Sequence, residues 1–318
     1  QTISTDTLVY SVAGDVEAPL VAAGLGTAED VAAVDLRGKV ALIKRGTLRF
    51  SEKVANAAGA GALGVVIYND SGGRVQGSLV QQEAVPALTI GGDDGQRLLD
   101  LLAAGPLRAR LTVDASIEQR PTSNVVAELP GNRGDNASIV IGGHLDSVPA
   151  GPGANDNSSG SAVVLELAHT LVQTPPSQRP ITLRFVLFGG EELGLHGSRY
   201  YVDRLSDADR RAIVAMINLD MVGVGNEWRF GGTDDLVQRA LGASTDLGAR
   251  GLPMRGPQSS ASDHASFLGA GVPAVFFYRT DDPNYHTAND RAEFVDPDAL
   301  GQAGTLVLRV LDELGSGQ

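Results

Sequence analysis

The sequence contains no cysteine and only five histidines among its 318 residues. Without cysteine there can be no disulfide framework and no thiolate metal site, so a metal centre has to be built from histidine, aspartate and glutamate. The same absence leaves the cellular compartment open. The chain also has no apolar run long enough to span a bilayer.

Positive charge is scarce as well. The chain carries 25 Lys and Arg against 38 Asp and Glu, a formal net charge of −13. An acidic surplus of this size argues against a nucleic-acid partner and against binding to an anionic membrane surface. A length of 318 residues exceeds one ordinary core, so we expect two domains. Because Gln1 opens the chain and no signal-like segment follows, we also expect a processed or trimmed chain.

The first third of the chain, residues 1–118, shows no cluster of histidines and no catalytic constellation. Short apolar runs alternate there with helical periodicity and with turns rich in glycine. We expect Asp93 or Asp94 to cap the second helix. The pattern predicts a small α/β domain with a structural or partner-binding role. The expected strands lie within 36–46, 64–68, 85–90 and 108–113, and the expected helices at 50–60 and 93–102.

Two stretches of this first domain resemble the protease-associated domain. One is Leu-Arg-Gly-Lys-Val-Ala-Leu-Ile-Lys-Arg-Gly at 36–46, and the other is Ala-Gly-Ala-Gly-Ala-Leu-Gly-Val-Val-Ile-Tyr-Asn at 58–69. The resemblance covers about a third of the chain. It implies a domain that contacts substrate or another protein.

A polar linker at 115–123 precedes the second domain, residues 119–318. Strands alternate with helices through this part, which predicts an α/β fold with a mostly parallel mixed sheet and helices on both faces. The segment 129–136 looks like a hairpin loop after a strand at 124–128. The further expected strands lie at 139–141, 181–188, 213–219 and 274–278, with helices after residue 160 and at 297–314.

Six side chains of the second domain follow separate strands or their loops. In open α/β sheets, ligands collect at the carboxyl ends of strands. Histidine and carboxylate ligands without a thiolate suit a pair of Zn²⁺ or similar divalent ions. A surface or capping role explains any one of these residues alone, but it is a poor account of all six. The six are His144, Asp156, Glu191, Glu192, Asp220 and His286.

The motifs around these residues resemble those of the cocatalytic dizinc aminopeptidases, which include secreted bacterial leucine-type enzymes. The matching stretches lie at 142–160, 191–198, 218–221 and 284–290. The resemblance implies two Zn²⁺ per chain. Asp156 would bridge them, with His144 and Asp220 on one ion and Glu192 and His286 on the other. Glu191 would be the general base, and Asp146 would orient the imidazole of His144.

The resemblance also implies an activity. A water bridging the two zinc ions would attack the first peptide bond of a substrate with a free N-terminus, with Glu191 moving the proton. The residue released would be apolar, and the enzyme would be secreted, extracellular or periplasmic. Tyr285 would either stabilise the oxyanion or simply pack beside His286. The bond between Asp156 and Asn157 is expected to be cis.

Other residues receive lesser roles. Asp263 and His264 belong to a Ser-Asp-His stretch that resembles the border of the family's substrate pocket, so we interpret both as supporting residues. Phe267 would line that pocket or belong to the core. For His169 packing is favoured over catalysis, and a supporting role for His196 is not favoured.

Three alternatives stay open at this point. A non-catalytic binding protein of this architecture would have lost metal ligands. A single-zinc glutaminyl cyclase shares the fold, and a dizinc carboxypeptidase usually carries its extra domain within the order of the ligands. Here the extra module precedes all ligands, whereas in similar proteins it follows an opening segment. We therefore expect part of that opening segment to be missing or supplied separately.

Overall fold

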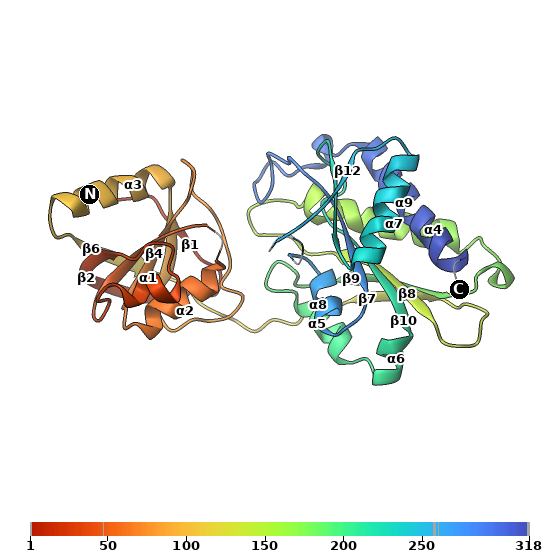
Figure 1. Cartoon of the computed structure of the whole chain (residues 1–318), viewed down its shortest axis with the longest axis horizontal. Coiled ribbons are helices and arrows are strands. Elements are labelled where there is room, and N and C mark those ends of the chain that lie inside the picture. The colour runs from red at the N-terminus through yellow and green to blue at the C-terminus, as the bar shows by residue number, and fades with distance from the viewer. Residues whose placement is uncertain (1, 47, 257–258, 260, 317–318) are drawn as a thin grey trace. The chain divides into compact units, whose positions relative to one another are not determined.

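The computed structural model describes residues 2–46, 48–256, 259 and 261–316. The chain divides into two compact units, Gln1–Arg120 and Pro121–Gln318. The division lies within the polar linker, slightly later than the expected boundary after residue 118. Figure 1 shows that each unit has its own sheet and helices. Two separate cores are what a chain of this length favours.

The first unit contains a six-stranded sheet in the order β1-β5-β4-β3-β2-β6. Neighbours from β2 to β5 run parallel, whereas β1 and β6 pair antiparallel at the two edges. Apolar clusters cover both faces of this sheet, which explains the continuous apolar runs of β3 and β4. The bounds are β1 Asp6–Thr7, β2 Gly14–Ala22, β3 Val40–Lys44, β4 Gly64–Tyr68, β5 Ala87–Ile90 and β6 Arg108–Val113.

Three helices complete this unit: α1 (Ala28–Ala32), α2 (Phe50–Gly59) and α3 (Gly92–Ala104). The expected cap of α3 was wrong. The cap residue is Gly91, without a side-chain bond, and Asp93 and Asp94 lie inside the first turn. Carboxylates there still favour the helix because they face the positive end of its dipole.

The second unit contains a seven-stranded sheet in the order β12-β11-β13-β10-β8-β9-β7. Most neighbours run parallel, and β7 and β11 introduce the antiparallel pairs. The predicted α/β class with a mostly parallel mixed sheet is confirmed. The bounds are β7 Val125–Leu129, β8 Ser138–His144, β9 Thr182–Phe188, β10 Ile213–Leu219, β11 Trp228–Gly232, β12 Gly251–Pro253 and β13 Ala274–Arg279.

The hairpin expected between β7 and β8 does not exist. β7 pairs antiparallel with β9, and β8 lies between β9 and β10. Both edges of β8 are therefore occupied by parallel neighbours. The segment 130–137 is a connection across the start of β9, as the hydrogen bonds from Asn132 N–H to Arg179 O and from Thr182 N–H to Ala137 O show.

Helices cover both faces of this second sheet (Figure 1). α4, α7 and α9 share one apolar cluster with Ile139 and Ile141 of β8, and α5 and α8 pack with Val140 on the other face. Alternate residues of β8 thus enter opposite cores. The bounds are α4 Gly160–Leu171, α5 His196–Asp203, α6 Asp207–Ala212, α7 Asp234–Asp246, α8 His264–Gly269 and α9 Pro297–Ser316.

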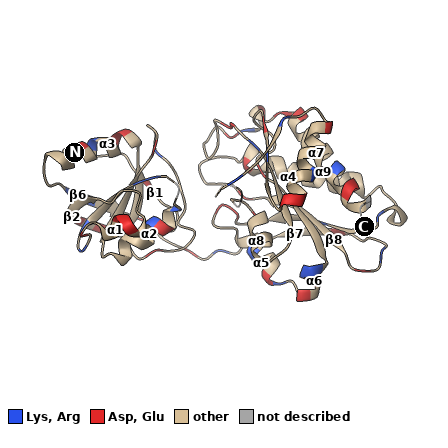
Figure 2. Ribbon diagram, viewed as in Figure 1, with Lys and Arg blue, Asp and Glu red and all other residues tan. Residues whose placement is uncertain are grey.

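Strands β8, β9, β10 and β13 end at the same edge of the sheet. The register pairs His144 with Phe188, and Leu219 with Phe277. Polar residues that follow these strand ends are therefore brought together. The strand β8 itself contains no Lys, Arg, Asp or Glu (Figure 2). Within the described residues, no helix is both long and apolar enough to cross a membrane.

Candidate metal centre

His144 is the last residue of β8 and is 1% exposed. Its Nε2 lies 3.1 Å from Oδ1 of Asp156 and 3.3 Å from Oδ1 of Asp220, the residue that follows β10. Its Nδ1 lies 3.0 Å from the carbonyl oxygen of Asp146. A proton on Nδ1 would be donated to that carbonyl, which leaves the Nε2 lone pair free for a metal ion.

A second imidazole approaches the same carboxylate from the other side. His286 Nε2 lies 3.1 Å from Oδ2 of Asp156 and 3.2 Å from Oε2 of Glu192. The two oxygens of Asp156 therefore face two different histidines, each with a further carboxylate beside it. This is the arrangement that a carboxylate shared between two cations requires.

The backbone around Asp156 is irregular. Residues Ala154–Ser159 form a distorted helical turn, and the peptide bond between Asp156 and Asn157 is cis, as expected. The amide of Asn157 donates to Leu219 O at 2.8 Å and accepts from Gly160 N–H at 2.9 Å. These bonds tie the turn to the end of β10 and to the start of α4.

Several buried polar atoms of this cluster lack a hydrogen-bond partner: His144 Nε2, His286 Nε2, Glu192 Oε1 and Asp220 Oδ1. Buried polar atoms are normally satisfied, so a group of four at one place needs an explanation. Among the described residues, no lysine or arginine forms an ion pair with these carboxylates. Imidazole nitrogens and carboxylate oxygens with free lone pairs fit zinc. Their ligand atoms also fall within 4.8 Å of one another in two overlapping groups, His144–Glu191–Asp220 and His144–Asp156–Glu192.

The pKa values show how strongly the cluster attracts positive charge. Burial opposes protonation of His286, but Asp156 and Glu192 outweigh burial and raise its pKa to about 9. Burial likewise opposes ionisation of Asp156, but its contacts with both imidazoles lower its pKa to about 2. Cations bound among these side chains would supply the positive charge that the carboxylates attract.

Glu191 precedes Glu192 in the turn after β9 and groups with His144 and Asp220. Burial raises its pKa well above the ordinary value, although His144 opposes the shift. A buried carboxylate with a raised pKa beside this candidate metal centre suits proton transfer near neutral pH.

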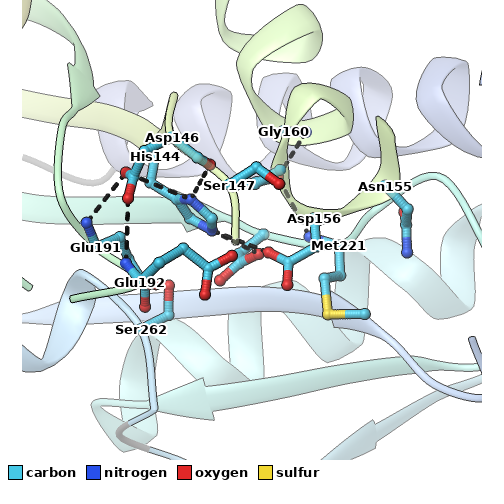
Figure 3. Close-up of polar contacts among 12 residues, drawn as sticks. His144, Asp146, Ser147, Asn155, Asp156, Gly160, Glu191, Glu192, Met221 and Ser262 are labelled. Carbon is cyan, nitrogen blue, oxygen red and sulfur yellow. Dashed lines mark hydrogen bonds and ion pairs between the residues drawn. The ribbon is translucent and has the colours of Figure 1, made fainter. Parts of the chain in front are cut away.

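Asp146, expected to orient the imidazole of His144, contacts it through its carbonyl oxygen and also holds another segment. Its carboxylate lies 3.8 Å from His144 Nδ1, farther than its own carbonyl oxygen. It accepts instead from three consecutive backbone N–H groups, those of Gly190 at 2.8 Å, Glu191 at 3.0 Å and Glu192 at 3.3 Å. Figure 3 shows this carboxylate beside the backbone nitrogens of the Glu191–Glu192 turn. Asp146 therefore holds that turn, and only its backbone contacts the imidazole at hydrogen-bond distance.

The remaining expected residues differ in exposure: Tyr285 is half-exposed, whereas the others are buried. Tyr285 stacks on His286, with ring centroids 3.8 Å apart, and half of its side chain is exposed. Asp263 and His264 are fully buried, and burial raises the pKa of Asp263 to about 7. His264 stacks on Phe276. Phe267 is 0% exposed and packs edge-on against Phe188, so it is a core residue and not a pocket wall.

Three polar residues at the site received no role from the sequence. The side chain of Asn124 accepts from Gly189 N–H at 3.1 Å and donates to Gly197 O at 2.8 Å. It therefore holds both ends of the segment 189–197, which contains the two glutamates. Asp290 and Asn155 connect the segments that carry His286 and Asp156. Asp290 ends one of the matching stretches, which is a signal that it belongs to the site but does not reveal what it contacts.

Two family profiles match the chain. Residues 124–311 match the profile of Peptidase family M28, and residues 16–98 match that of the PA domain. Aminopeptidase YwaD of Bacillus subtilis is 35% identical over 316 residues, which cover 93% of this chain and 66% of that protein. This chain spans no more than 66% of the length of the first curated relatives that it matches.

Solved structures resemble both units together. The aminopeptidase from Aneurinibacillus sp. strain AM-1 has a TM-score of 0.79 and 34% identity over 98% of this chain and 77% of its own. BSAP, a zinc aminopeptidase from Bacillus subtilis, has a TM-score of 0.74 and 33% identity over 98% and 79%. The family profile covers more than half of the chain, and the chain belongs to Peptidase family M28, with a PA domain in its first unit.

Proposed function

We propose that this chain is a zinc-dependent aminopeptidase that hydrolyses the first peptide bond of substrates with a free N-terminus. One observation carries the proposal. The two oxygens of Asp156 face the imidazoles of His144 and His286, and Glu191 lies beside this cluster. Relatives named as aminopeptidases, including one named as a zinc enzyme, support the same activity.

We propose two Zn²⁺ per chain. His144 and Asp220 would hold one ion, Glu192 and His286 the other, and Asp156 would be shared. When bound, zinc polarises a carbonyl oxygen and makes water nucleophilic near neutral pH. The unsatisfied nitrogens and oxygens of these residues support this ligand set.

The remaining chemistry belongs to the chain itself. Glu191 accepts a proton from the attacking water and returns it to the leaving amine, for which its raised pKa is suited. Tyr285 donates its hydroxyl proton to the developing oxyanion. A phenol keeps its proton near neutral pH, so the Tyr285 hydroxyl can donate this hydrogen bond from its position beside His286.

Two finer points rest on the resemblance to the secreted leucine-type enzymes. The preferred N-terminal residue would be apolar, and the enzyme would act outside the cytoplasm. The PA domain would contact substrate or another protein. Two imidazole–carboxylate pairs, His144 with Asp220 and His286 with Glu192, support two ions rather than one.

A set of blocked peptides tests the activity. A leucyl peptide with a free N-terminus and an amidated C-terminus should release leucine, whereas the same peptide with an acetylated N-terminus should stay intact. Release from the C-terminus of the acetylated peptide would instead identify a carboxypeptidase. Release of ammonia from an N-terminal glutamine, without release of an amino acid, would identify a cyclase.

A further inference from the structure

Asp290 occupies a position that neither the ligand set nor the proton transfer uses. It lies four residues after His286, and its side chain is 4% exposed. Its Oδ1 accepts from Asn155 N–H at 2.7 Å and its Oδ2 from Asp156 N–H at 3.0 Å. A buried carboxylate that accepts two backbone N–H groups forms charge-assisted bonds, which fix the backbone strongly.

The backbone of Asp290 adds to this connection. Its carbonyl oxygen accepts from Ala154 N–H at 3.2 Å. Asp290 therefore accepts hydrogen bonds from three consecutive backbone N–H groups, and the last of them belongs to Asp156, whose carboxylate faces both imidazoles.

The other end of the His286 segment is attached to the same turn. Asn155 Nδ2 donates to Asp282 Oδ2 at 2.8 Å, and Asn155 Oδ1 accepts from Gly223 N–H at 2.9 Å. Between these attachments the two segments approach closely, because a Cβ at Gly151 would lie 2.1 Å from Thr287 O. The segment 282–290 is thus fixed at both ends against the segment 151–156, and His286 lies between the two attachments.

We propose that Asp290 is a positioning residue that sets the distance between the Asp156 carboxylate and the His286 imidazole, and so assembles the metal site formed by Asp156, Glu192 and His286. The proposal rests on the zinc ligand set proposed above. It also explains why the residue is an aspartate. An asparagine of the same shape has one acceptor oxygen, and its NH₂ group would face the second backbone N–H and leave it without a partner.

The test compares Asp290→Asn with the wild-type protein by zinc titration. The affinity for the more weakly bound zinc should fall by about 10–100-fold, as for other residues that support metal ligands. With Co²⁺ in place of zinc, the visible absorption band of that site should shift, which a loss of overall stability alone would not cause. Asp30→Asn is the matched control, because Asp30 Oδ2 accepts from Leu25 N–H at 2.7 Å and Thr27 N–H at 3.3 Å in the first unit. The control should keep both affinities and the Co²⁺ spectrum.

Two equivalents of zinc with wild-type affinity and an unchanged Co²⁺ spectrum in Asp290→Asn would overturn the proposal. Should that variant not fold, hydrogen exchange of the zinc-free wild-type protein decides. The amides of Asn155 and Asp156 should exchange slowly without zinc, because Asp290 holds them, and rapid exchange would overturn the proposal. Wild-type protein that binds no zinc would refute the proposed function instead, and the exchange measurement would still report on Asp290.

Discussion

Glu191 and Glu192 are neighbours in the chain but meet different surroundings. Glu192 lies 3.2 Å from His286, whereas Glu191 groups with His144 and Asp220. We predict that Glu191→Gln keeps its zinc and loses about 10²–10⁴-fold in kcat, the usual contribution of a general base. Glu192→Gln should lose zinc affinity first. Metal analysis and turnover of a leucyl anilide, measured on both variants, check this.

The two variants serve as controls for each other because they differ by one position in the same turn. Both retain the shape of the side chain and the backbone N–H groups that bind Asp146. Near-normal turnover in Glu191→Gln with two zinc ions bound would show that another group moves the proton.

Asp146 permits a prediction that separates two possible roles. Asp146→Ala removes the acceptor of three backbone N–H groups but keeps the carbonyl oxygen that contacts His144 Nδ1. We therefore expect zinc to remain bound on His144 while kcat falls at least tenfold, because the Glu191 turn is no longer held. Each unsatisfied N–H costs about 1–3 kcal/mol when buried, so unfolding by urea should show lower stability. Loss of zinc with kcat preserved at saturating metal would support the imidazole-orienting role instead.

The sequence reveals residues of the site to different extents. His144 and Asp220 could be placed because each directly follows an apolar run, and parallel strand ends meet at one edge. Asp156 could be placed because it lies in the loop that follows the strand of His144. The contacts of Asn124 and Asp290 could not be placed, because their partners are backbone N–H groups of distant segments. A sequence shows which side chains can accept a hydrogen bond, but it does not show which backbone donors lack one.

At the scale of elements, the start of α4 lies directly against the end of β10. An ideal Cβ would lie 2.2 Å from Leu219 O at Gly160 and 2.5 Å from it at Gly143. Glycine at both positions lets α4 and β8 approach that carbonyl, next to Asp156 and Asp220. We predict that Gly160→Ala destabilises the second unit by about 1–3 kcal/mol, the usual cost of adding a methyl group to a closely packed site. The same variant should bind zinc more weakly. Chemical denaturation and zinc titration measure both effects.

Gly301 provides the comparison. It lies in α9, and a Cβ there would have no neighbour within 4 Å. Gly301→Ala should therefore stabilise the protein by about 0.5–1 kcal/mol, since alanine loses less backbone entropy in a helix. Equal stability changes in the two variants would contradict the close packing of α4 on β10.

The period of apolar residues revealed five strands of the second unit and its helices α4 and α9. It revealed neither the helices α5 to α8 nor the position of β7 in the sheet. Its sequence neighbour β8 looks like a hairpin partner because only a short polar segment separates them. However, β8 already has β9 and β10 as parallel neighbours on its two sides. The free edge belongs to β9, and β7 binds there. Strand order of this kind depends on competition between edges, which local periodicity does not report.

At the scale of the whole molecule, each unit has its own apolar core, and only the second unit would also be stabilised by zinc. The apolar clusters of the first unit contain only residues of that unit, and the same holds for the second. All proposed zinc ligands lie in the second unit. Zinc that binds only the folded form stabilises the unit that binds it, by about 2.7 kcal/mol at a free concentration 100 times the dissociation constant.

We therefore predict two transitions in calorimetry of the intact chain, of which a chelator lowers only one. For a domain of 150–250 residues, 1 kcal/mol shifts Tm by about 2–4 °C, so removal of zinc should lower that transition by about 5–11 °C. The shift is assigned with Glu192→Gln, which should lower the same transition even with zinc present, while Asp30→Asn should affect only the other. Tm values that fall together on chelation would mean that the two units unfold as one. Release of about two equivalents of zinc at the transition that the chelator lowers would support the proposed pair of Zn²⁺ ions in the second unit.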